Sequence, residues 1–438
     1  MPTRLKLVCL TLILALFYSP LSAVLNRLGG GVIGTGVSET ALGLIALIPI
    51  LTLILRGRLK IPRPGVVDLW MLGWLFYGGI AFLTTYNLHE EIFSTLLVLR
   101  YFFVIPFAYF IFRVCVSTSR EYEQIVEIYL TFLKVATIYM LIEFAAVNLF
   151  GLRLSLELFF SRTGEDFRLY DGVFGAFLKP AGPIHGSQNA SLVSLISTFS
   201  FAIALRVYRR KSDQIWLLFA IASLCVSFTV TAVIAASAVI YFLGIPIFRG
   251  IPKIYSRIIA GFGVIGGFLY RKEILAFRDK GTTGRPSHYY ERTKLIIDQS
   301  VQSFVDGLTA HPLGTGWPNH LAPKDSPAHQ VFDTAPLEIF IFKLGYYLGP
   351  FFLIFFLAMN FYFLIRLSRL NRRNPGVIAL QFAAIVILGL LISTVHYESF
   401  TRTGFSYLYA FCLALVAAYQ PAGTIAAQTN STQAAPAP

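Results

Sequence analysis

Seven histidines are the residues of this sequence best suited to proton transfer, because imidazole titrates at about pH 6.5. They are His89, His185, His288, His311, His320, His329 and His396. None lies in the middle of an apolar run or in a connection that the charge pattern assigns to the cytoplasm. This distribution predicts an extracytoplasmic active site that uses titratable groups. The alternative is that histidine is a common residue at membrane interfaces.

A second set of ionisable residues interrupts apolar runs. Arg100 lies within TLLVLRYFFVIPF, and Lys343 lies in the run that follows the longest polar segment. A charge inside a membrane is costly and usually faces a cavity or a partner of opposite charge. Arg100 could therefore line a cavity or pair with Glu143, and Lys343 could line a cavity or pair with Glu338. Lys134 lies nearer the cytoplasmic half of its span, and its side chain is expected to extend to the interface.

The longest polar segment contains a predicted helix followed by a glycine turn. Apolar residues recur at three- and four-residue steps over about 289–307, which predicts an amphipathic helix with Arg292 in its first turns. The sequence HPLGTGW follows at 311–317, where Gly314 and Gly316 would allow close approach of another backbone.

His329 and Asp333 follow this turn and are spaced four residues apart. A helix would place both on one face, where the carboxylate could orient the imidazole. The same pair could contribute to a metal site, but a structural or catalytic site needs at least a third ligand. No third ligand stands at a fixed spacing, so the sequence favours a site without metal or cofactor.

The composition is that of a membrane protein. Of 438 residues, 56% are hydrophobic and 13% are charged, whereas soluble domains carry about 25% charged residues. A membrane-spanning helix needs about 20 apolar residues, so the chain has enough for about twelve. This excludes a soluble enzyme and a disordered chain. The four cysteines are too sparse for a disulfide scaffold and lie in or beside apolar runs.

The apolar runs predict an all-α polytopic membrane protein with about twelve transmembrane helices. Residues 1–420 would form one transmembrane domain, and the low-complexity residues 421–438 a disordered cytoplasmic tail. The expected spans are 7–25, 38–55, 67–84, 92–113, 123–149, 188–207, 214–229, 231–248, 257–271, 337–365, 376–394 and 403–419.

The charge distribution assigns sides to these spans. The net charge is +14, and more than half of the 36 Lys and Arg residues lie in the N-terminal segment and five short connections. By the positive-inside rule these face the cytoplasm, together with both termini. The first span then acts as an uncleaved signal anchor, and nucleic acid is not expected as a partner. The long loops 150–187 and 272–336 lie on the opposite side.

The large loop resembles that of the O-antigen ligase and polymerase superfamily. The matching pattern is an arginine opening a helix (Arg292), then Pro-x-Gly-x-Gly (312–316), then a histidine near the loop's end (His329). The glycine pair Gly345 and Gly349 completes it. A second similarity is AGPIHGSQNASL at 181–192, which contains an asparagine, Asn189, at the start of the next span.

The resemblance implies a C-type glycosyltransferase-like fold in a bacterial inner membrane and an inverting, metal-independent glycosyl transfer at the periplasmic face. An acceptor glycan attacks a donor glycan that undecaprenyl diphosphate carries. The product would be O-antigen, capsule or exopolysaccharide, and a chain-length regulator or a flippase could be further partners.

The resemblance also suggests roles for particular residues. His329 would be the base or would orient the acceptor, and Asp333 would assist it or act as base itself. Cations would bind the diphosphate, because arginine holds phosphate in a bidentate fashion and stays charged. They are Arg292, Arg285, Arg100 and Lys343. Asn189, His396, Glu398 and Arg402 would line the sugar and acceptor site.

Two departures from the family pattern leave alternatives open. The region SFTVTAVIAAS at 227–237 lacks the arginine that the family often places there, and Phe340 stands where ligases typically have glycine. The second departure favours a repeat-unit polymerase over an O-antigen ligase, which would pass the polymer to a lipid A core. A polysaccharide or lipid transporter is the third possibility, with Arg100, Lys134, Glu143 and Lys343 along its path.

Overall fold

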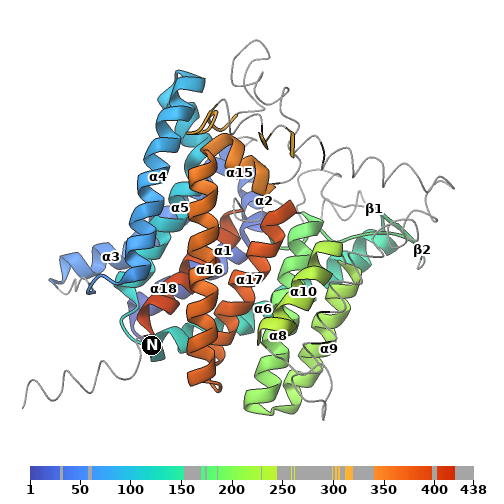
Figure 1. The fold of residues 1–438 in the computed structure, drawn as a ribbon. Coiled ribbons are helices and arrows are strands. Elements are labelled where there is room, and N and C mark those ends of the chain that lie inside the picture. The colour runs from blue at the N-terminus through green and yellow to red at the C-terminus, as the bar shows by residue number, and fades with distance from the viewer. Residues whose placement is uncertain are drawn as a thin grey trace, which may run out of the picture.

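The computed structural model describes residues 1–29, 33–57, 62–151, 169–172, 175–184, 186–227, 229–243, 311–318, 340–396 and 402–419, with a few single residues between 258 and 305. Most of these residues are helical (Figure 1). The helices are α1 (Thr3–Leu16), α2 (Tyr18–Gly29), α3 (Ile33–Leu55), α4 (Val66–His89), α5 (Ile92–Cys115), α6 (Ser119–Leu149), α8 (Ser187–Tyr208), α9 (Lys211–Val226), α10 (Val230–Leu243), α15 (Phe340–Leu348), α16 (Pro350–Arg373), α17 (Ile378–His396) and α18 (Thr403–Ala418).

The described helices include several that could cross a membrane. Four are long and apolar enough, and up to six qualify if each of two bent pairs is one span. Leu42–Leu55, Ile378–Thr394 and Thr403–Ala418 are shorter apolar helices. The chain is therefore a helical membrane protein. The expected span 257–271 falls largely outside the described residues.

Three expected spans differ in shape from the prediction. The run 337–365 is two helices, α15 and α16, that meet at Gly349. The run 7–25 bends by 77° between α1 and α2, and α5 bends by 59° after Arg100. Long apolar runs alone do not reveal such breaks, because hydropathy reports lipid compatibility and not backbone direction.

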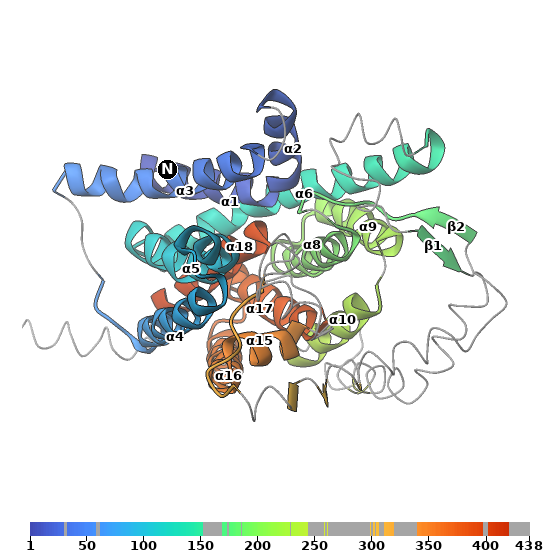
Figure 2. The ribbon, with the colours of Figure 1, turned by 90° about the horizontal axis from the view of Figure 1, so that it is seen from above.

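Helices α17 and α18 form the centre of the bundle. Seen from above, they lie between α4 and α5 on one side and α8 to α10 on the other (Figure 2). Every residue of α18 from Thr403 to Ala417 is buried. An α-helix that is apolar on all faces is typical of a protein interior or of a membrane span, and the other helices surround this one.

A proline explains one contact that joins α4 to α5. Pro106 lies inside α5 and has no N–H, so the carbonyl of Phe102 lacks its usual partner four residues on. The indole Nε1 of Trp74, on α4, donates to this carbonyl at 2.9 Å. The indole ring also packs against Phe352 and Phe356 of α16. Trp74 thus holds three helices together at the proline site.

Serines join α8 to α9 where close packing needs small side chains. The hydroxyls of Ser194 and Ser223 lie 2.7 Å apart, and Ser227 donates to Ser194 at 3.1 Å. Ser191 donates to the carbonyl of Ser227. Small residues that share hydrogen bonds are a common means of helix association in membranes.

Hydrogen bonds that involve charged side chains join helices at one end of the bundle. The charge pattern assigns this end to the cytoplasm. Arg4 binds Glu121 at 2.6 Å and the carbonyl of Cys115 at 2.7 Å. At the end of α18, Tyr419 donates to Glu123.

The prediction of an all-α chain needs one small correction. Strands β1 (Leu169–Gly172) and β2 (Gly175–Leu178) pair as an antiparallel hairpin within the first long loop, with Leu169 opposite Leu178. The side chain of Asn148, at the end of α6, accepts from the N–H of Leu178 at 2.8 Å and donates to its carbonyl at 2.9 Å. The hairpin is therefore anchored to the last turn of α6.

Candidate functional site

The turn at 311–318 lies against two helices, as its glycines predicted. Gly314 and Gly316 have φ values of 90° and 87°, which side chains rarely adopt. A Cβ at Gly316 would lie 2.8 Å from the carbonyl oxygen of Thr84 on α4, and one at Gly314 would overlap the carbonyl oxygen of Tyr347 on α15. The expected close backbone approach is confirmed.

The same turn closes the end of α15. The N–H groups of Thr315 and Gly316 donate to the carbonyls of Tyr346 and Tyr347, each at 3.1 Å. These carbonyls belong to the last turn of the helix, where no further helical N–H is available. Gly349 completes the junction, because a Cβ there would lie 2.9 Å from the carbonyl oxygen of Pro312.

Trp317 connects this turn to α4 and α5. Its N–H donates to Thr85 Oγ1 at 3.0 Å, and His89 Nε2 lies 2.9 Å from its carbonyl oxygen. Its ring centroid is 5.1 Å from that of Phe102 on α5 and 5.2 Å from that of Tyr347 on α15. The indole therefore lies between the two helices that carry Arg100 and Lys343.

The predicted amphipathic helix at about 289–307 falls mostly outside the described residues, but part of it contacts α15. Phe304 lies so close to Gly345 that a Cβ at that glycine would overlap its ring. The ring centroids of Phe304 and Phe342 lie 5.3 Å apart. Val301 and Val305, in the same predicted helix, are exposed.

The second motif, at 181–192, is held by several helices. The buried carboxylate of Glu143 on α6 accepts from the N–H of Gly182 at 2.8 Å. A Cβ at Gly182 would lie 2.7 Å from that of Ala190 on α8. The carbonyl of Pro183 accepts from the N–H of Ser19 on α2 at 3.2 Å. The segment is thus fixed in place before α8 begins.

Asn189 lies in the first turn of α8 and is buried. Its amide nitrogen donates to the carbonyl of Ile184 at 3.4 Å, which braces the turn before the helix. Ile184 also packs against Gly404, two residues after Arg402. Ile184 therefore lies between the start of α8 and the first turn of α18.

The predicted residues fall into two groups at one end of the bundle. Arg100, at the bend of α5, and Lys343, on α15, belong to the two helices whose aromatic rings contact Trp317, whereas Asn189 lies in the first turn of α8 and Arg402 directly precedes α18. His396 ends α17, which packs against both α8 and α15 and so links the groups. The remaining predicted residues lie outside the described part of the chain: His329, Asp333, Arg292, Arg285 and Glu398.

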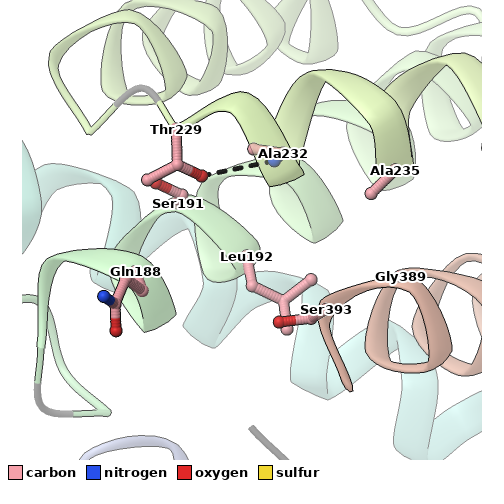
Figure 3. A pocket seen from close by; sticks show the side chains of 8 residues that line it. All are labelled: Gln188, Ser191, Leu192, Thr229, Ala232, Ala235, Gly389 and Ser393. Carbon is pink, nitrogen blue, oxygen red and sulfur yellow. Dashed lines mark hydrogen bonds between the residues drawn. The ribbon is translucent and has the colours of Figure 1, made fainter. Parts of the chain in front are cut away.

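A small hollow opens between α8, α10 and α17 (Figure 3). It encloses about 220 Å³, including its open mouth. Only about 10 Å³ of this space is comparable with the roughly 300–1,000 Å³ of pockets for drug-sized ligands, so this hollow alone is too small for a lipid-linked oligosaccharide. Its lining residues are Gln188, Ser191, Leu192, Thr229, Ala232, Ala235, Gly389 and Ser393.

Within the described ranges, no group of three or more His, Cys, Asp or Glu side chains could hold a metal ion. The pair His329 and Asp333, considered above as metal ligands, lies outside these ranges.

Sequence reasoning missed the residues that hold the turn in place. The sequence pattern indicates no role for Trp317 or Thr85, and it indicates none for His89 beyond that of an extracytoplasmic histidine. An aromatic residue directly after a Pro-x-Gly-x-Gly turn is a usable signal, because glycines that permit close approach imply a neighbouring surface. Which surface it would be depends on the tertiary fold.

No protein-family model matches this sequence, and no curated protein matches it either.

Proposed function

We propose that this chain is a membrane glycosyltransferase that polymerises undecaprenyl-diphosphate-linked repeat units at the periplasmic face of the bacterial inner membrane. The proposal includes about twelve membrane spans, termini in the cytoplasm and a C-type glycosyltransferase-like fold. One observation carries it: Gly314, Gly316 and Gly349 of the family-like pattern meet in one junction between α4, α15 and α16. Motif glycines that are far apart in sequence but close in space support the proposal that the pattern belongs to one site.

The proposed reaction is a single displacement at the anomeric carbon of the donor sugar. The acceptor hydroxyl forms the new carbon–oxygen bond while the bond to the diphosphate breaks, and undecaprenyl diphosphate leaves with the bonding electrons. His329, or Asp333, takes the proton of the acceptor hydroxyl, which is worth about 10²–10⁴ in rate.

The cations of this site would stabilise the departing diphosphate. Arg292 and Arg285 would supply guanidinium groups from the loop, and Arg100 and Lys343 would add charge from either side of the Trp317 turn. Each preorganised contact to the developing charge is worth about 10²–10³ in rate. No metal is required where fixed cations take this role.

A deletion strain tests the proposal directly. Polysaccharide reduced to a single repeat unit, and restored to a ladder by the wild-type gene, supports the polymerase. Complete loss of polymer from lipid A, with polymer still made on its carrier, supports the ligase instead. An unchanged surface polysaccharide would contradict both.

One structural feature favours the transporter as a second candidate. Transporters bind substrates at interrupted helices within the membrane, and α5 bends by 59° directly after Arg100. Lipid-linked repeat units that accumulate on the cytoplasmic face of a deletion strain would support this function, whereas accumulation on the periplasmic face supports the polymerase.

A further inference from the structure

The last turn of α4 holds the peptide groups on both sides of Trp317. Thr85 Oγ1 accepts from the N–H of Trp317 at 3.0 Å, and His89 Nε2 lies 2.9 Å from the carbonyl oxygen of Trp317. Thr85 and His89 are four residues apart, so they share one face of the helix. Thr85 is fully buried, so water does not compete with Trp317 for its hydroxyl.

The segment 315–317 is also bound to α15 through its backbone, and the Trp317 ring contacts α5. Thr315 and Gly316 donate to Tyr346 and Tyr347, while the Trp317 ring fills the space beside Phe102. Figure 1 shows α4 and α15 at the same end of the bundle. Connecting segments are usually mobile, yet this one is bonded on two sides by two helices.

The bonded segment separates the two parts of the loop that carry the proposed chemistry. Arg292 lies before it in the chain, and His329 and Asp333 lie after it. Its ring neighbour Phe102 lies two residues after Arg100, just past the bend of α5. A contact that fixes residues 315–317 therefore anchors the chain between Arg292 and His329.

We propose that Thr85 and His89 are positioning residues: they clamp the Trp317 peptide against α4 and so anchor the chain at a point between Arg292 and His329. The role of the clamp in catalysis rests on the proposed function. Its existence does not. When either side chain loses its polar atom, a half-buried Trp317 peptide group loses its partner, and the segment opens more often.

Cysteine labelling of the full-length protein in detergent measures this opening. The reporter is Pro318→Cys, because Pro318 is buried and follows Trp317. It is placed in a Cys225→Ala background, since Cys225 is exposed and Cys9, Cys115 and Cys412 are buried. Thr85→Val and His89→Leu are each expected to label roughly tenfold faster than the parent.

Two variants serve as matched controls. Thr85→Ser keeps the accepting hydroxyl and should label at the parent rate. Thr84→Val should do the same, because the Thr84 hydroxyl bonds to the carbonyls of Ile80 and Ala81 within α4. Equal rates for Thr85→Val and Thr84→Val, or a parent that already labels fast, would overturn the clamp. Mass spectrometry separates local opening from unfolding, because an unfolded chain would also label the buried cysteines.

Activity measurements then test the positioning role. Without the reporter, Thr85→Val should lower kcat for polymer formation roughly tenfold with little change in KM, and Thr85→Ser should restore it. Faster labelling with full activity would overturn the positioning role. If the wild-type protein forms no polymer, the proposed function fails, while the labelling rates still decide whether the clamp exists.

Discussion

At the scale of single residues, the glycine turn makes a prediction about stability. Gly314→Ala should destabilise the protein by about 1–3 kcal/mol, because its φ of 90° is unfavourable for alanine and a Cβ would overlap the carbonyl of Tyr347. The midpoint of thermal unfolding in detergent measures the change. Gly79→Ala is the control, since Gly79 lies in α4 with open space around it. Equal midpoints for the two variants would contradict the packing of the turn.

A second residue-scale prediction concerns the charge that binds the diphosphate. Arg292→Ala should lower the rate of polymer formation by about 10²–10³, and Arg292→Lys should recover little, because an ammonium group cannot replace the bidentate guanidinium. The assay is polymer formation by membranes that contain equal amounts of each inserted variant. Full activity of Arg292→Lys would show that only the point charge matters.

At the scale of helices, the contact between Trp74 and α5 can be tested by a double-mutant cycle. Trp74→Phe removes the donor to the Phe102 carbonyl and should cost about 1–3 kcal/mol of unfolding free energy. Pro106→Ala restores a main-chain N–H at the position that normally bonds this carbonyl. Trp74→Phe should therefore cost less in the Pro106→Ala background. The same cost in both backgrounds would show that the indole ring stabilises only by packing.

Helix positions could be predicted from the apolar runs, but the breaks within those runs could not be predicted from hydropathy alone. The apolar runs locate most described helices, whereas the run 337–365 hides the junction at Gly349. Pro350 was a signal for it, because proline favours the first turn of a helix. The docking of Pro312 against Gly349 had no such signal, since it joins segments distant in sequence.

The candidate site was predictable to a similar degree. Spacing and residue type identified Gly314 and Gly316 as points of close approach, and the structure shows what they approach. The partners, Thr84 and Tyr347, could not be deduced, because each contact depends on how α4 and α15 pack. Asn189 was predicted to contact sugar, and its amide braces the turn at Ile184.

At the scale of the whole molecule, the charge pattern predicts which ends of the helices share a side of the membrane. His311 and Arg373 are both exposed. In spheroplasts, His311→Cys should react with a membrane-impermeant maleimide, and Arg373→Cys should react only after permeabilisation. Reaction of both variants before permeabilisation would contradict the predicted topology.

Reconstitution of the purified protein with an undecaprenyl-diphosphate-linked repeat unit in proteoliposomes tests the central claim most directly. The account predicts a ladder of longer glycans on the lipid carrier, with one undecaprenyl diphosphate released for each new linkage, and neither product with Arg292→Ala. A repeat unit that stays unjoined, or that only moves between the leaflets, would contradict it.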